Sequence, residues 1–149
     1  DVAWGSCVDD REQMIVEATS QRWAHDGYPK RAFCMELRPD SDYPLTYAIQ
    51  NVNVDGDFSG HRLAPQLYRY LLRRMDGLIL RGGPDQSPGG RYIWYHLAQF
   101  HDVVVIAVNE DTHEMHQVSV DPERREVCLP SRTLYGSAES YSLFASAAG

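Results

Sequence analysis

Residues 59–77, with the sequence SGHRLAPQLYRYLLRRMDG, form the most periodic stretch of the chain. The large apolar side chains recur at helical spacing, at Leu63, Leu67, Tyr70, Leu71 and Met75. Ser59 can cap the N-terminus of a helix, and Arg73 and Arg74 suit the negative end of a helix dipole. The stretch therefore predicts an amphipathic helix over residues 60–76.

Helix signals are also present towards both ends of the chain. Asp9 and Glu12 approximate a capping box, which predicts a helix over 9–26. Within that range, the helical spacing i, i+4 and i+8 relates Ile15, Thr19 and Trp23. Residues 137–148 are rich in Ala and Ser and include three larger apolar side chains, so we expect a closing helix there.

Strand signals fill the intervening regions. Residues 32–54, 78–81 and 102–129 carry β-branched and aromatic residues between turn signals of Pro, Asp and Gly. We therefore expect an α+β fold in a single domain over residues 1–149. Its small, mostly antiparallel sheet would be combined with an N-terminal helix, a middle helix and a C-terminal helix.

Composition excludes several classes of partner. The chain has 149 residues, with 14 Lys and Arg against 21 Asp and Glu, so its net charge is −7. Nucleic-acid binding needs clustered cations, and the dispersed cations of this chain argue against such a partner. No apolar run approaches the ~20 residues that cross a bilayer, so we expect no membrane partner.

The histidines are the residues most suggestive of chemistry, because imidazole is a common metal ligand and a neutral-pH base. His96 and His101 lie five residues apart, while His113 and His116 bracket Glu114 and Met115. Zinc peptidase helices use HExxH, which places two imidazoles and a general base on one helix face. Neither pair has that pattern. His113 and His116 are also consistent with opposite faces of a solvent-edged strand that binds nothing.

Four segments together resemble the fungal secreted zinc endopeptidases of the deuterolysin and lysine-specific (aspzincin) type. Ser6–Arg11 is similar to the opening of that family, and Gly77–Arg81 is similar to its short apolar strand. Tyr92–His101 resembles the family's zinc helix, a YTWFHELMH-like stretch. Ser137–Ala145 is close to the family's C-terminal stretch. The resemblance identifies the chain as a shortened member that lacks an intact HExxH.

The resemblance implies a damaged metal site. His96 matches the first zinc histidine of the family, His101 lies one residue late for the second, and the general-base glutamate is missing. An alternative alignment with the family places His113 on the zinc helix instead of His96. The candidate metal ligands are therefore His96, His101 and His113. We expect no bound cofactor, and zinc is the metal that such residues could take.

This resemblance implies a secreted protein with a protease-like scaffold. Without a base beside a zinc-bound water, turnover should collapse, so we expect a non-catalytic, effector-like interaction protein rather than an enzyme. Its partner would be a protein of a host or a competitor. For a secreted chain we expect a disulfide between Cys34 and Cys128, because both lie in strand-like runs while Cys7 precedes a predicted helix.

Two alternatives remain open at this point. One is an active zinc endopeptidase with a rearranged His and Glu site. The other is a small secreted ribonuclease-like protein in which Glu114 and His116, or His113, act as acid and base. In that case a basic face would hold the phosphate, and its members would be Arg69, Arg73, Arg74 and Arg81.

Overall fold

The computed structural model describes residues 2–8, 13–25, 28–56, 63–83, 86–130, 132–136 and 139–148. It has an α+β fold whose strands pair almost entirely antiparallel, which confirms the predicted fold class. The chain divides into two compact units, Asp1–Ala64 and Pro65–Gly149. We refer to them as unit 1 and unit 2. The prediction that residues 1–149 form one domain stays a prediction.

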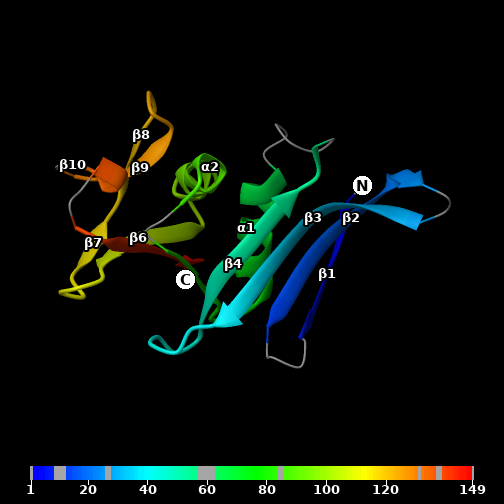
Figure 1. Cartoon of the computed structure of the whole chain (residues 1–149), viewed down its shortest axis with the longest axis horizontal. Helices are drawn as coiled ribbons and strands as arrows, with labels where there is room; N and C mark the ends of the chain where they lie inside the picture. Colours follow the sequence, from blue (N-terminus) through cyan, green and yellow to red (C-terminus); the bar gives the residue numbers. More distant parts are fainter. Residues whose placement is uncertain are drawn as a thin grey trace. The chain divides into compact units, whose positions relative to one another are not determined.

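Unit 1 is built on a four-stranded antiparallel meander (Figure 1). Its strands follow one another in sequence order, as β1 (Val2–Val8), β2 (Met14–His25), β3 (Tyr28–Pro39) and β4 (Thr46–Val54). Along β2, every second side chain is buried, at Met14, Val16, Ala18 and Ser20. This period of two is the pattern of a strand with one covered face.

The predicted N-terminal helix is therefore wrong, because residues 14–25 form β2 and residues 2–8 form its partner β1. Ile15 and Thr19 are spaced as on a helix, but the buried side chains are their neighbours on the other face of the strand. The buried positions include Ala18 and Ser20, whose small side chains give a weak hydrophobic signal. The capping residues Asp9 and Glu12 lie outside the described residues.

Unit 2 combines antiparallel strands with two helices (Figure 1). Its elements are α1 (Leu63–Arg74, beginning at the end of unit 1), β5 (Ile79–Gly82), α2 (Pro88–Leu97), β6 (Val103–Asn109), β7 (Met115–Gln117) and β11 (Tyr141–Ala147). The strand order within this unit is β5-β11-β6-β7. The middle helix predicted over 60–76 is confirmed as α1, and strands are confirmed in all three predicted regions.

The predicted C-terminal helix is wrong, because Tyr141–Ala147 form the strand β11 between β5 and β6. Its first five residues, Tyr141 to Ala145, are all buried. A strand that is covered on both faces shows a continuous run instead of alternation, so its periodicity does not distinguish it from a helix. Ser137 and Ala138, where the helix was expected to begin, lie outside the described residues.

A smaller antiparallel sheet lies between β7 and β11 in the sequence. It contains β8 (Ser119–Asp121), β9 (Glu126–Leu129) and β10 (Arg132–Thr133), in the order β10-β9-β8, and the short 3-10 helix η2 (Leu134–Gly136) follows. Helix α2 packs against β9. Among the described residues, no helix has the length and apolar character needed to cross a membrane.

Candidate functional site

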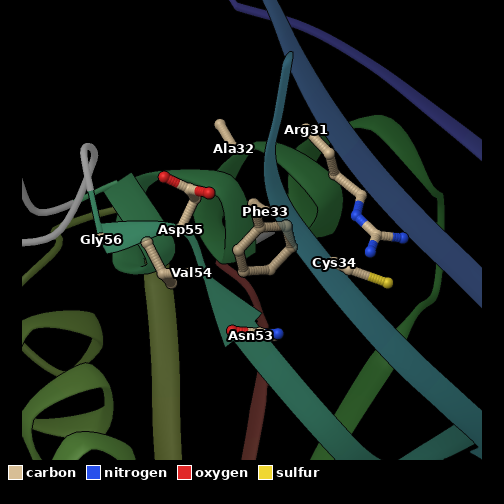
Figure 2. A pocket seen from close by; sticks show the side chains of 8 residues that line it. All are labelled: Arg31, Ala32, Phe33, Cys34, Asn53, Val54, Asp55 and Gly56. Atoms are coloured by element: carbon tan, nitrogen blue, oxygen red, sulfur yellow. The ribbon is translucent and has the colours of Figure 1, made fainter.

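A pocket in unit 1 lies where the pairing of β3 with β4 ends. We call it the β3–β4 pocket, and its volume is about 270 Å³. Eight residues line it: Arg31, Ala32, Phe33, Cys34, Asn53, Val54, Asp55 and Gly56 (Figure 2). The sequence patterns do not predict this site, and among its residues only Cys34 is singled out by them, as a disulfide partner.

An irregularity in β3 creates the lining on that strand. Phe33 pairs with Ala18 of β2 and Arg31 pairs with Thr19, so Ala32 is an extra residue opposite a continuous β2. Such a bulge shifts the alternation of side chains and re-aims its neighbours. As a result, Ala32 and Phe33 are both buried, while Arg31 is exposed and Cys34 is partly exposed.

The pairing register brings polar side chains together on the same face as Cys34. Glu17 of β2 and Asn53 of β4 are its direct partners on either side. Directly paired residues of antiparallel strands project from the same face. Glu17, Cys34 and Asn53 therefore form a row across three strands.

The β4 side of the pocket is fixed by one backbone hydrogen bond beyond the strand. The Asp55 N–H donates to the Ala32 carbonyl oxygen at 2.9 Å, so the position of Asp55 is tied to the bulge. In Figure 2, the Asp55 carboxylate and the Arg31 guanidinium lie on opposite sides of the Phe33 ring. The pocket thus has a negative group and a positive group in its lining, while the Phe33 side chain is buried.

Arg31 forms a weak, solvent-exposed ion pair with Glu17. Its Nη1 lies 3.3 Å from Glu17 Oε1, and the two side chains are 59% and 44% exposed. Exposed ion pairs of this kind contribute about 0–1 kcal/mol, because water screens them and both side chains lose conformational freedom. The pair is therefore easily exchanged for another partner.

The predicted metal ligands lie in separate parts of unit 2. His96 is in α2, where its ring packs edge-on against Tyr92 and Tyr95 at centroid distances of 4.4 and 5.0 Å. His101 follows α2 in a turn, and His113 lies in the β6–β7 turn with a left-handed φ of 62°. In the part of the chain that the structure describes, no group of three His, Cys, Asp or Glu side chains could hold a metal.

The two candidate catalytic residues do come together. His116 Nε2 lies 3.7 Å from Glu114 Oε2, and the His116 ring packs edge-on against Tyr141 at 5.8 Å. The Glu114 side chain is 71% exposed, so solvent surrounds this pair. Whether either residue takes part in catalysis stays a prediction.

The arginines of the predicted phosphate-binding face are largely paired with acidic side chains. Arg69 Nε lies 2.8 Å from Asp102 Oδ1, and Arg73 Nε lies 3.6 Å from Asp102 Oδ2. Arg81 Nη2 lies 2.8 Å from Glu110 Oε1. Burial raises the pKa of Asp102, but the hydrogen bond and charge of Arg69 outweigh that effect and hold the pKa below its usual value. These arginines therefore connect elements of unit 2, and the ribonuclease-like alternative gains no support.

The predicted disulfide between Cys34 and Cys128 is wrong, because both residues are thiols. Cys34 belongs to the β3–β4 pocket of unit 1. Cys128 lies on β9 of unit 2, where its Sγ is 3.1 Å from Ser119 Oγ. The side chain of Cys7 lies outside the described part of the chain.

Comparisons with known proteins find no matching family model and no matching curated protein. Solved structures do match over most of the chain, and the three described next have TM-scores below 0.5. An IAA acetyltransferase from Bacillus cereus has a TM-score of 0.49 and 13% identity, covering 99% of this chain and 100% of its own. An acetoin utilization protein from Exiguobacterium sibiricum has a TM-score of 0.46 and 12% identity, covering 90% of this chain and 60% of its own. An aminoglycoside 6'-N-acetyltransferase complexed with coenzyme A has a TM-score of 0.40 and 10% identity, covering 93% of this chain and 74% of its own.

These findings overturn the resemblance to the aspzincin peptidases. The similar structures are two acetyltransferases and an acetoin utilization protein, and no family model identifies a peptidase. The amphipathic helix that the resemblance implies after Ser6–Arg11 is also absent, because Met14–His25 form the strand β2. The interpretations as a protease-like effector and as a rearranged endopeptidase are therefore wrong. Secretion and a protein partner, which depended on that resemblance, stay predictions.

Proposed function

We propose that this chain binds a small polar molecule carrying an amino group in the β3–β4 pocket. The observation that supports this proposal is the Asp55 carboxylate in the lining of a cavity of about 270 Å³. An ammonium group forms a charge-assisted hydrogen bond with a carboxylate. The Asn53 amide adds a hydrogen-bond donor and an acceptor within the same lining.

The size and construction of the pocket narrow the ligand further. Pockets for drug-sized ligands are typically about 300–1,000 Å³. This cavity lies just below that range, so it suits a ligand smaller than a typical drug molecule. Arg31 and Asn53 come from two hydrogen-bonded strands, and the backbone hydrogen bond from Asp55 to Ala32 fixes the residue that follows β4. The pocket therefore needs little rearrangement to bind.

The test is a titration with a series of small alkylamines, followed by the backbone amide resonances of Asn53, Asp55 and Gly56. Asp55→Asn keeps the shape of the side chain and removes its charge. We expect it to weaken binding about tenfold or more, because a hydrogen bond to a charged group contributes about 1.5–3 kcal/mol. Asp42→Asn makes the same charge change at an exposed turn position and serves as the control. Equal affinities of the two variants would contradict the proposal.

Compounds that bind are next incubated with acetyl-coenzyme A, since two of the similar structures are described as acetyltransferases. Release of the coenzyme A thiol is measured for wild type and for Asp55→Asn. Release that Asp55→Asn lowers would identify the pocket as the acceptor site of an acetyl transfer. Binding without release would leave the chain as a binding protein for amines.

A further inference from the structure

The guanidinium of Arg31 is placed to do more than pair with Glu17. It lines the β3–β4 pocket, and the bulge at Ala32 directs it to the face that carries Cys34. Arginine has five N–H donors. Within the described part of the chain, its recorded polar contact is the single one between Nη1 and Glu17 at 3.3 Å. Nε and Nη2 can therefore donate to a ligand.

We infer that the ligand of this pocket also carries an anionic group, which binds Arg31 in exchange for Glu17. This inference rests on the proposed function and adds the second half of the ligand. Asp55 and Arg31 both line the pocket (Figure 2), so a small zwitterion carries one group of opposite charge for each of them. Amino acids and aminoalkyl phosphates are molecules of this class.

The exchange is favourable because the two partners of Arg31 differ in geometry. Glu17 offers one oxygen to one nitrogen, and both side chains are close to half exposed or more. A carboxylate or phosphate inside the pocket can accept two parallel N–H bonds from the guanidinium, which is the stronger arrangement. Glu17 then acts as an internal competitor that keeps Arg31 in place when the pocket is empty.

The experiment compares two matched series of probes. One contains ω-amino acids of increasing length, from glycine to 5-aminovalerate, and the other contains the alkylamines that lack the carboxylate. Dissociation constants come from the amide resonances of Cys34 and Asn53, and the side-chain Nε–H resonance of Arg31 reports on its own contact. We expect at least one amino acid to bind about tenfold or more tightly than its matched amine.

Three variants assign that preference to residues. Arg31→Gln is expected to abolish the difference between the two series, and Arg31→Lys is expected to retain part of it. Glu17→Gln removes the competitor and is expected to tighten amino-acid binding about two- to fivefold, as follows from the small contribution of an exposed ion pair. The same variant should leave the alkylamines unchanged at constant ionic strength.

Glu36→Gln is the matched control for Glu17→Gln. It also raises the net charge by one. Glu36, however, lies on β3 five residues beyond Arg31, and its Oε2 accepts a hydrogen bond from Gln13 Nε2 at 3.3 Å. An equal gain in affinity from both glutamine variants would mean a general charge effect and would overturn the inference. Circular dichroism of each variant confirms that it is folded.

The outcomes separate the two proposals. If alkylamines bind with an affinity that depends on Asp55 and the carboxylate adds nothing, the inference about Arg31 fails and the proposed function stands. If the amino acids gain affinity but Arg31→Gln preserves that gain, the inference also fails. If neither series shifts the pocket resonances, the proposed function fails, and the inference fails with it.

Discussion

Gly82 gives the sharpest test of packing in unit 2. A Cβ atom at this position would lie 2.8 Å from Trp94 Nε1 and 2.9 Å from both Trp94 Cε2 and Gln86 Nε2. Ordinary contacts begin at 3.4 Å, so either the strand or the indole must move by 3.4 − 2.8 = 0.6 Å. Gln86 can move aside, but Trp94 is buried in α2 and cannot.

We therefore expect Gly82→Ala to destabilise the protein. Overpacking of a filled interior costs about 1–3 kcal/mol. Replacing glycine by alanine also stiffens the unfolded chain, which stabilises the native state by about 0.4–1 kcal/mol. The net change in the free energy of unfolding should be a loss of about 1–2 kcal/mol. Urea denaturation followed by far-ultraviolet circular dichroism measures it.

Gly83→Ala is the matched control, because a Cβ atom there would have nothing within 4 Å. The stiffening of the unfolded chain is common to both variants, so their difference isolates the clash at about 1–3 kcal/mol. Trp94→Leu removes the two clashing indole atoms, because the leucine side chain ends at its δ carbons. The double variant with Gly82→Ala should be more stable than the sum of the single effects, by about 0.5 kcal/mol or more. Equal stabilities of Gly82→Ala and Gly83→Ala would refute this account of the packing.

Three further outcomes are expected. Ser87→Ala should lower the free energy of unfolding by about 1 kcal/mol in urea denaturation, because Ser87 Oγ caps α2 by accepting from Gly90 N–H at 3.1 Å. Asp102→Asn should destabilise by about 1 kcal/mol at neutral pH, and the difference from wild type should vanish in acid. The pKa of Asp102 is lowered in the folded state, so its contribution is present above the unfolded pKa and is lost as pH falls through the folded value. Burial raises the pKa of Tyr68 and Tyr135, so ultraviolet titration of the native protein should leave two tyrosines un-ionised about one pH unit above the ordinary value of ~10.

The sequence predicts those elements whose local pattern agrees with their environment. Helix α1 has one covered face, and its buried residues Tyr68, Leu71 and Leu72 lie at helical spacing. Strand β6 is a run of β-branched residues between turns, as a buried strand should be. Strand β11 is buried without alternation over its first five residues, so its conformation is decided by pairing with β5 and β6. Tertiary contacts of that kind leave no local signal.

The candidate site was missed for a related reason. Histidines attract attention because imidazole chemistry suits many sites, but His96 packs between two tyrosine rings and His113 lies in a solvent-exposed turn. The pocket instead uses Arg31 and Asp55, which are 24 residues apart in the sequence and look like ordinary surface residues. Their proximity depends on the register of β3 with β4, and nothing in the local sequence specifies that register.

The bulge at Ala32 connects the fold of unit 1 with its proposed chemistry. If Ala32 were a regularly paired residue of β3 and the strand had no bulge, alternation would place Arg31 on the same face as Phe33, whose side chain is 1% exposed. A guanidinium buried there without a partner would be strongly unfavourable. The bulge avoids that burial and moves Arg31 to the polar face beside Cys34, and its Ala32 carbonyl accepts the hydrogen bond that holds Asp55. One inserted residue therefore positions both charges of the pocket, so a change in the register of β3 should abolish recognition of the amine and of the anion together.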